Sequence, residues 1–320
     1  MTTIRFLLTL LGALCATSPA MAQPYPSKPM RLVVGYSPGG GNDLIARIVA
    51  ARLQERLGQP VFVDNKPGAQ SIVAAELVAR AAPDGYTLLV APSGPMTINP
   101  AVYSKLSYAP DRDFAPVSLL AEFPLLLAVG GEQPVKTVAE LVAHGRAHPG
   151  LANFASSATP FHLAAELFNQ RTGSAFQHIP YRGSGDAVQA VAAGTVLMTL
   201  SDSGPMAGLI KSGRLRALAQ TTAKRHAAFP DVPTMAEAGI ADMEISLWTG
   251  IVAPAGTPAD IVALLNAAIV ATLALPDVRA RLADIAVDPR STTPDDYRQL
   301  IARDAARWKA VASAAKIRLD

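Results

Sequence analysis

The 320-residue chain contains a single cysteine, Cys15, and only 17% of its residues are charged. Cys15 lies in an N-terminal segment that we expect to be removed, so the mature chain has no thiol for a disulfide or for thiolate chemistry. Lysine and arginine are scattered, and the formal net charge is only +3, so nucleic-acid binding has little support. No long apolar run follows the N-terminal segment, and half of all residues are hydrophobic, which indicates a well-packed globular protein.

The N-terminal segment has the parts of a secretory signal. Arg5 precedes the apolar run Phe6–Ala16, and Ala20-Met-Ala22 forms a small-x-small cleavage site. The apolar run is too short for a membrane anchor. Leu14 stands where a lipoprotein signal needs a small residue before its cysteine. We therefore predict cleavage after Ala22 and exclude residues 1–22 from the fold.

The stretch from Arg31 to Asp43 predicts a strand, a glycine turn and a helix start. Leu32–Val34 is a short apolar run, Gly39–Gly41 forms the turn, and apolar residues recur at helical spacing from Leu44 onward. The backbone N–H groups and the dipole of such a helix start favour an anion. Leu44 replaces the third glycine of a G-x-G-x-x-G motif, and no Gly-Lys-Ser/Thr follows, so a nucleotide cofactor is not expected.

Strand-sized apolar runs alternate with helical patterns along most of the chain, which predicts an α/β fold with mainly parallel sheets and crossover helices. Extended apolar runs at 113–129 and 245–253 are expected to carry the chain into a second domain and back. The predicted organisation is a first lobe of residues 23–123 with 247–320 and a second lobe of residues 124–246.

Four predicted turns share one composition, since each follows a strand and is rich in serine, threonine, glycine or asparagine. They are Ser37–Asp43, Ser93–Pro95, Ser156–His162 and Ser201–Pro205. In open α/β sheets such turns lie at the carboxyl edge of the strands, where ligands bind. The alternative is that small polar residues merely form turns. Arg182, at another helix start, is either a carboxylate clamp or an ordinary surface arginine.

Two catalytic or metal-binding interpretations have weaker support. The G-x-S-x-G motif of many serine hydrolases is absent, although Ser157, His162 and Asp202 remain a triad that only folding can assemble. His144 and His148 have helical spacing but few carboxylates nearby, which favours a solvated helix end over a metal site. We expect no metal and no cofactor.

A set of short segments spread along the chain carries a family resemblance. They are Tyr25-Pro-Ser-Lys-Pro29, Ser37-Pro-Gly-Gly-Gly41, Asn65-Lys-Pro-Gly68, Ala82-Pro-Asp-Gly-Tyr-Thr-Leu-Leu89, Ile98-Asn-Pro100, Asp113-Phe-Ala-Pro-Val117, His178-Ile-Pro-Tyr-Arg-Gly183, Gly213-Arg-Leu-Arg-Ala-Leu-Ala219, Asp231-Val-Pro-Thr234 and Ala253-Pro-Ala-Gly-Thr-Pro258. In this order and at these spacings, the chain resembles the tripartite tricarboxylate transporter solute-receptor family, also called the Bug receptors, over nearly all of its expected mature length.

The resemblance implies a two-lobed periplasmic binding protein with a hinge of crossing strands. Such receptors trap small carboxylates and similar anions and deliver them to a membrane permease. The resemblance also implies that the turns Tyr36–Asp43 and Ser156–His162 hold the ligand carboxylate. The expected ligand-binding residues are Tyr36, Ser37, Gly40, Gly41, Asn42, Asp43, Ser93, Ser156, Ser157, Thr159, His162 and Asp202.

Two departures from the family pattern bear on the ligand. The turn Ser157-Ala-Thr-Pro160 is shorter than the usual glycine- and asparagine-containing version. Leu200-Ser-Asp202 replaces the common Phe-Asp-Asn, so either Ser201 or Asp202 stands for the family aspartate. Asp43 adds the alternative of a ligand with a positive group, such as an amino acid.

We expect capture of a small organic anion, a mono-, di- or tricarboxylate or an amino acid, rather than catalysis. The backbone N–H groups of Gly40, Gly41 and Asn42 and the hydroxyls of Ser157 and Thr159 are expected to replace water around a carboxylate. The expected protein partners are inner-membrane permease subunits, and the receptor is expected to be a monomer. Signalling to a membrane sensor kinase, a secreted hydrolase and a receptor that has lost its ligand are the alternatives.

Overall fold

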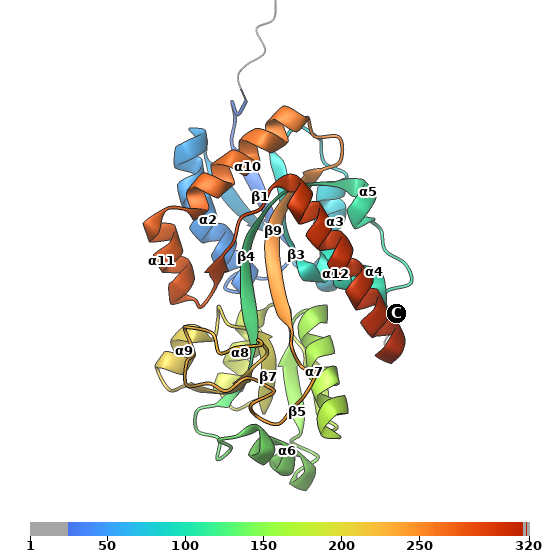
Figure 1. The fold of residues 1–320 in the computed structure, drawn as a ribbon, viewed down its shortest axis with the longest axis vertical. Coiled ribbons are helices and arrows are strands. Elements are labelled where there is room, and N and C mark those ends of the chain that lie inside the picture. Colours follow the sequence, from blue (N-terminus) through green and yellow to red (C-terminus); the bar gives the residue numbers. More distant parts are fainter. Residues whose placement is uncertain (1–24, 316–317, 319–320) are drawn as a thin grey trace, which may run out of the picture.

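The computed structural model describes residues 25–315 and 318, so the predicted signal segment lies outside the described residues. The chain forms two lobes, one above the other in Figure 1. Lobe 1 contains β1 (Met30–Val34), α2 (Gly41–Leu57), β2 (Val61–Asn65), η1 (Ala69–Ser71), α3 (Ile72–Ala79), β3 (Thr87–Pro92), η2 (Gly94–Ile98), α4 (Asn99–Val102), α5 (Pro110–Asp113), α10 (Ala259–Leu273), α11 (Pro276–Asp284), β10 (Asp288–Pro289) and α12 (Pro294–Ala315). Lobe 2 contains α6 (Val138–Ala147), β5 (Asn153–Ser156), α7 (Thr159–Thr172), β6 (Gln177–Pro180), α8 (Ser184–Ala192), β7 (Met198–Asp202), α9 (Ala207–Lys211) and β8 (Leu215–Gln220).

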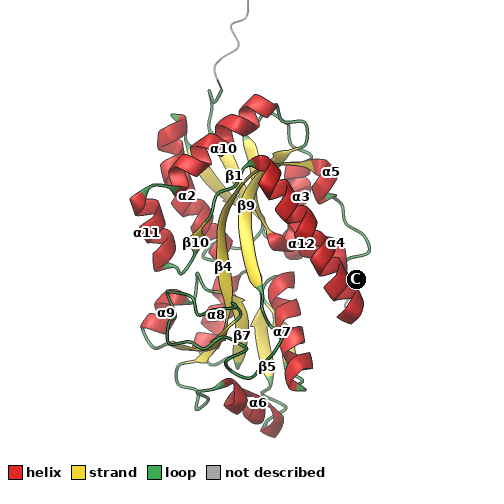
Figure 2. Cartoon of the chain, viewed as in Figure 1, coloured by secondary structure: helices red, strands yellow, loops and turns green. Residues whose placement is uncertain are grey.

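Two long strands, β4 (Phe114–Gly130) and β9 (Ser246–Pro254), join the lobes (Figure 2). The described strands form one sheet in the order β2-β1-β3-β9-β4-β7-β5-β6, and β8 and β10 also pair with β4. The outer strands of each lobe pair in parallel, β1 with β2 and β3, and β5 with β6 and β7. The predicted fold class, two α/β lobes with a hinge of crossing strands, is confirmed.

The partner of β4 changes at one point along its 17 residues. From Phe114 to Pro124 it pairs antiparallel with β9, and from Leu125 to Val129 it pairs antiparallel with β7. The predicted lobe boundaries, 123/124 and 246/247, fall at this change of partner. We therefore propose these boundaries on the ground that the partner of β4 changes there.

The near-continuous apolar character of β4 follows from its position. Almost all of its residues are buried, because helices cover both faces of the sheet at the strands that join the lobes. One apolar cluster runs through both lobes and includes Leu32, Ile45, Phe123 and Phe161. The lobes therefore meet through packed side chains as well as through the backbone.

Of two local predictions, one is confirmed and the other is wrong. The Thr137 side chain accepts a hydrogen bond from the Glu140 N–H, which confirms the predicted cap of α6. The prediction of a loop at Ser93–Pro95 was wrong, because a π-helical turn, η2, begins at Gly94 and continues into α4. The Thr97 hydroxyl donates to the Ser93 carbonyl at 2.8 Å and stabilises this turn.

Within residues 25–315, no single helix is long and apolar enough to cross a bilayer; α10 and α11 meet the length and composition criteria only as a pair bent by 72°.

Gly250 on β9 lies where the core has no room for a side chain. A Cβ there would lie 2.6 Å from the Ser118 carbonyl oxygen and would overlap the ring of Tyr297, whose hydroxyl donates to the Ala91 carbonyl at 2.9 Å. We expect Gly250→Ala to lower the free energy of unfolding by about 1–3 kcal/mol, as overpacking does in other cores. Gly208→Ala is the matched control, since nothing lies within 4 Å of its added Cβ. Urea unfolding of both variants measures this difference, and equal midpoints would contradict it.

Candidate functional site

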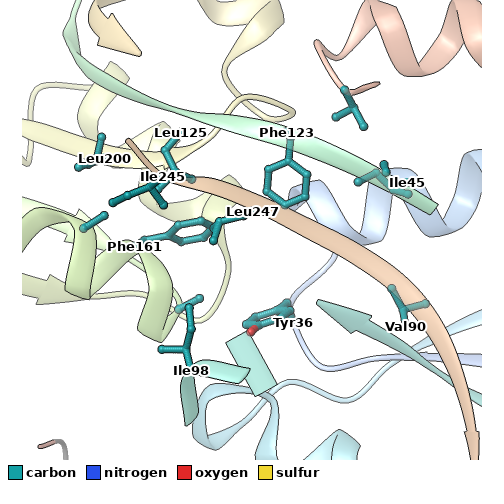
Figure 3. Close-up of a cluster of buried hydrophobic side chains, with 14 of the residues drawn as sticks. Tyr36, Ile45, Val90, Ile98, Phe123, Leu125, Phe161, Leu200, Ile245 and Leu247 are labelled. Carbon is teal, nitrogen blue, oxygen red and sulfur yellow. The ribbon is translucent and has the colours of Figure 1, made fainter. Parts of the chain in front are cut away.

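A cavity of about 470 Å³ opens between the lobes. Its wall combines the end of β1, the loop before η1 and two segments of lobe 2. The lining residues are Gly35, Tyr36, Pro67, Gly68, Ala69, Gln70, Ser71, Ser157, Tyr181 and Arg182. Beside it, Tyr36 belongs to the apolar cluster of Figure 3, which includes Phe161 of lobe 2 and Leu247 of β9.

The loop Pro67–Ser71 brings polar atoms to the cavity in an unusual backbone conformation. Ala69, Gln70 and Ser71 all have positive φ, between 44° and 71°. Asn99 holds the loop by donating its side-chain amide to the Gln70 carbonyl at 3.0 Å. Gly35 is required opposite, because a Cβ at this position would overlap the Ser71 hydroxyl. The loop therefore places Gln70 and Ser71 against the end of β1.

Two side-chain atoms of this loop are buried without a hydrogen-bond partner, Ser71 Oγ and Gln70 Oε1. Ser71 is completely buried. Polar atoms left unpaired in a protein interior carry a desolvation cost that a bound partner removes. Both residues line the cavity, so these buried atoms lie in its wall.

Arg182 is the cationic residue of the cavity wall, and no acidic residue lines it. Within the described part of the chain, no carboxylate forms an ion pair or hydrogen bond with Arg182. Its guanidinium has donors in a planar arrangement that matches a carboxylate. The cavity is therefore suited to an anion and unsuited to an isolated cation.

Asp43 is fully engaged by its own lobe. Its carboxylate accepts hydrogen bonds from the Gly39 N–H, from Arg47 Nε and from Asn65 Nδ2, each at 2.9 Å. Asn65 also donates to the Tyr36 carbonyl, so this network fixes the shape of the glycine turn. Burial opposes ionisation, but the bonds from Arg47, Gly39 and Asn65 outweigh it and hold the pKa of Asp43 below its ordinary value.

The rest of the first turn faces lobe 2. The Gly41 N–H donates to Asp202 Oδ2 at 2.9 Å, and Gly40 and Ser37 lie against Ser184 and Gly183. Of the predicted anion donors at the α2 start, the Gly41 N–H is therefore bonded to lobe 2. Asn42 is half-buried, and its Oδ1 has no partner. Tyr36 lines the cavity, and burial raises the pKa of its hydroxyl far above the ordinary value, so that it stays neutral.

The second turn divides between the cavity and the interior of lobe 2. Ser157 lines the cavity, whereas the Thr159 hydroxyl donates to Asn99 Oδ1 across the lobes at 2.9 Å. Ser156 Oγ and His178 Nε2 share a hydrogen bond of 2.8 Å. The His162 ring stacks on His178 with centroids 4.0 Å apart. Desolvation and the neighbouring His162 lower the pKa of His178 to about 4, so the pair is not charged together.

The contacts of the possible hydrolase triad do not connect its members. His162 contacts His178, Phe154 and Glu166, and the Asp202 side chain accepts from Gly41, Ser184 and Ser201. Among the described residues, none of these contacts reaches Ser157. Ser93, another expected ligand residue, is buried at the start of η2 and does not line the cavity.

Histidine and acidic residues do not form a metal-binding cluster in the described parts of the chain, where no group of three or more was found. His144 and His148 stack on each other with centroids 4.5 Å apart at the end of α6.

Sequence reasoning missed the loop Pro67–Ser71 and did not include Tyr181 among the site residues. One signal was available, since Asn65-Lys-Pro-Gly68 follows a predicted strand and ends in a glycine turn, like the four turns that were chosen. Its left-handed residues Ala69 to Ser71 are not glycines, so their positive φ, which turns the loop into the cleft, could not be predicted from residue type.

Comparisons with known proteins agree with this architecture. The profile of the tripartite tricarboxylate transporter family receptor matches residues 45–317. Protein BugT of Bordetella pertussis is 37% identical over 312 residues, which cover 95% of this chain and 96% of that protein. A Rhodopseudomonas palustris protein solved with adipate has a TM-score of 0.88 and 36% identity, covering 92% of this chain and 99% of that one. MatC of the same organism, solved with bound malate, has a TM-score of 0.86 and 34% identity, covering 90% and 99%.

The Asp43 network predicts a pH-dependent contribution to stability. Because the folded pKa is lowered, the contribution is complete above the unfolded value of about 3.9 and is lost as the pH falls through the folded pKa. We expect Asp43→Asn to reduce the free energy of unfolding by about 1.5–3 kcal/mol at pH 7. The difference from the wild type should shrink progressively below about pH 4. Urea unfolding between pH 7 and pH 3 measures it, with Asp260→Asn on the exposed start of α10 as control. A difference that does not change with pH would refute the charged network.

Proposed function

The chain belongs to the tripartite tricarboxylate transporter receptor family, and on this premise we propose that it is a periplasmic solute receptor that captures a small organic anion between its lobes. The family profile covers most of the chain, and the relatives match it over nearly their full length. The finer proposal is that the loaded receptor delivers its ligand to a tripartite tricarboxylate-type permease in the inner membrane. The predicted signal segment supports export to the periplasm.

The unpaired charge of the cavity is the observation that carries this proposal. Arg182 stands at a polar cavity without an acidic neighbour in the wall, and Ser71 and Gln70 contribute buried polar atoms that have no protein partner. A carboxylate suits the Arg182 guanidinium and the Ser71 hydroxyl, because it offers a negative charge and several acceptor sites to these donors. Gln70 Oε1 is itself an acceptor, so it needs a donor group elsewhere on the ligand. We therefore propose a carboxylate as the ligand group.

The volume of the cavity supports a small ligand. At about 470 Å³ it lies in the lower part of the usual range for small-molecule sites. The relatives solved with adipate and with malate hold acids that carry a carboxylate at each end. We propose a ligand of this class, with one carboxylate at Arg182 and the rest of the molecule against Ser71, Ser157 and Tyr36.

This assignment redistributes the roles expected from the sequence. We retain Tyr36 and Ser157 as ligand contacts and add Ser71, Gln70 and Arg182. The donors of Gly41 and Thr159 contact the other lobe instead. Asp43 holds the glycine turn through three hydrogen bonds, which leaves it poorly placed to choose a ligand with a positive group.

Capture rather than catalysis fits this chemistry. The proposed ligand contacts supply hydrogen bonds and a positive charge, whereas a nucleophile with an adjacent base is not among them. Binding through groups from both lobes favours the closed arrangement, since the ligand gains its full set of contacts only there.

Isothermal titration calorimetry against mono-, di- and tricarboxylates tests the ligand class. We expect at least one dicarboxylate to bind and Arg182→Ala to weaken that binding by about tenfold or more, the cost of a lost charge-assisted bond. Arg279→Ala is the matched control, because it removes an exposed arginine distant from the cavity wall. No binding to any acid in the panel would refute the proposal.

The variant Ser71→Ala distinguishes a role of Ser71 in ligand binding from a role in the stability of the fold. The Ser71 hydroxyl has no protein partner, so its removal should leave the unfolding temperature unchanged and reduce the affinity for the ligand by roughly tenfold. Thr221→Val is the opposite control, since this buried hydroxyl bonds the Ile245 carbonyl at 2.6 Å outside the cavity. That variant should lose stability and keep its affinity. A stability loss in Ser71→Ala without an affinity loss would remove Ser71 from the site.

A further inference from the structure

Two helix starts, one from each lobe, face each other beside the ligand cavity. They are the first turns of α2 in lobe 1 and α8 in lobe 2, and neither has a side-chain cap from its own N-cap residue. The two turns approach closely because their surfaces are built from glycine. We call this set the glycine seam; it consists of Gly39, Gly40, Gly41, Gly183, Gly185 and Gly204.

At Gly41, Gly183 and Gly185 the seam is too tight for a side chain. A Cβ on Gly185 would lie 3.0 Å from the Gly39 carbonyl oxygen, and one on Gly183 would lie 2.8 Å from the Ser37 Cβ. A Cβ on Gly41 would overlap the carboxylate of Asp202. These contacts cross from one lobe to the other, so they exist only in the closed arrangement.

Asp202 lies at the centre of the seam. It is the last residue of β7 and is only 2% exposed. Its Oδ2 accepts from the Gly41 N–H of lobe 1 at 2.9 Å and from the Ser184 hydroxyl of lobe 2 at 3.2 Å. Its Oδ1 accepts from the Ser201 hydroxyl at 2.8 Å. The described residues include no cationic partner for it, so backbone and hydroxyl donors alone stabilise this buried acid.

The physical need for such an acceptor follows from the geometry. The first N–H groups of a helix have no partner within the helix and carry partial positive charge. Two such ends packed together repel each other and exclude the water that would otherwise hydrate them. An oxygen acceptor between them removes both costs. Asp202 supplies it from lobe 2 to the α2 start of lobe 1.

We propose that Asp202 is an interlobe latch, which stabilises the closed arrangement by bonding Gly41 before any ligand is bound. The inference rests on the proposed function only in treating the protein as a receptor that opens and closes. In the open form, Asp202 and the Gly41 N–H are each hydrated, and closure exchanges those contacts for a mutual bond. The anion position at the α2 start is then filled by the protein itself, and the ligand is confined to the cavity at Gly35, Ser71 and Arg182.

Spin-label distance measurements on the ligand-free protein test the latch. Labels on Gln54→Cys in α2 and Gln189→Cys in α8 report the separation of the lobes, and the expected mature chain has no other cysteine. Circular dichroism confirms that each variant is folded. Asp202→Ala removes the acceptor, and Gly41→Ala blocks the contact from the other lobe, so failure of one variant to fold leaves the other to decide.

The expected wild-type result is a dominant short distance without ligand. Asp202→Ala and Gly41→Ala should each lower the closed-to-open ratio by about tenfold or more, the scale of a buried hydrogen bond whose remaining partner is left unsatisfied. Asp186→Asn, which removes an acid from the first turn of α8, should match the wild type. The double variant Gly41→Ala/Asp202→Ala should match Asp202→Ala alone, because the two changes act on one contact.

Three results would overturn the latch. They are a wild type that is mainly open without ligand, unchanged distances in both single variants, and additive effects in the double variant. The measurement uses no ligand, so a failed carboxylate panel would not affect it. Conversely, unchanged distances would leave the ligand proposal at Arg182 and Ser71 intact.

Discussion

The antiparallel pairing of β4 with β9 sets the position of every other element. β4 leaves lobe 1 for lobe 2, and β9 returns beside it over Phe114–Pro124. In lobe 1, β3 pairs antiparallel with β9 and therefore runs toward lobe 2. In lobe 2, β7 pairs antiparallel with β4 and therefore runs back toward lobe 1. The parallel strands beside them follow the same direction, so the carboxyl ends of both sheets, and the turns that follow them, meet at one cleft.

The alternation of strands and helices, the apolar run of β4 and the returning run of β9 were all predictable from sequence, because each depends on local periodicity or on burial of a whole segment. The choice of site residues was harder. Gly41 and Ser157 both stand in a turn of small residues that follows a strand, yet one faces a carboxylate of the protein and the other faces the cavity. Which donor is already used depends on contacts between residues 161 positions apart, as for Gly41 and Asp202, and no local pattern records them.

Some polar groups at the interface between the lobes are hydrogen-bonded within the protein, and others have no partner. At the glycine seam, a buried donor of one lobe bonds an acceptor in the other lobe, so the protein itself satisfies this hydrogen-bonding group. At the cavity, Ser71 and Gln70 keep buried atoms without a partner, and Arg182 has no acid beside it in the wall. Incomplete hydrogen bonding costs free energy in the empty protein. In the function proposed above, that cost favours a ligand whose groups match those of the cavity.

The glycine seam has a consequence for how this protein tolerates variation. Apart from Gly39, its glycines face the opposite lobe, so larger residues there leave the apolar core of each lobe untouched. Such variants would accumulate in cells at normal levels, since abundance follows the stability of the fold. In a saturation mutagenesis experiment on the proposed receptor, the seam would therefore appear as a group of positions where ligand binding is lost while protein abundance is kept. That signature separates residues needed for movement of the lobes from residues needed for folding, without a structure of either state.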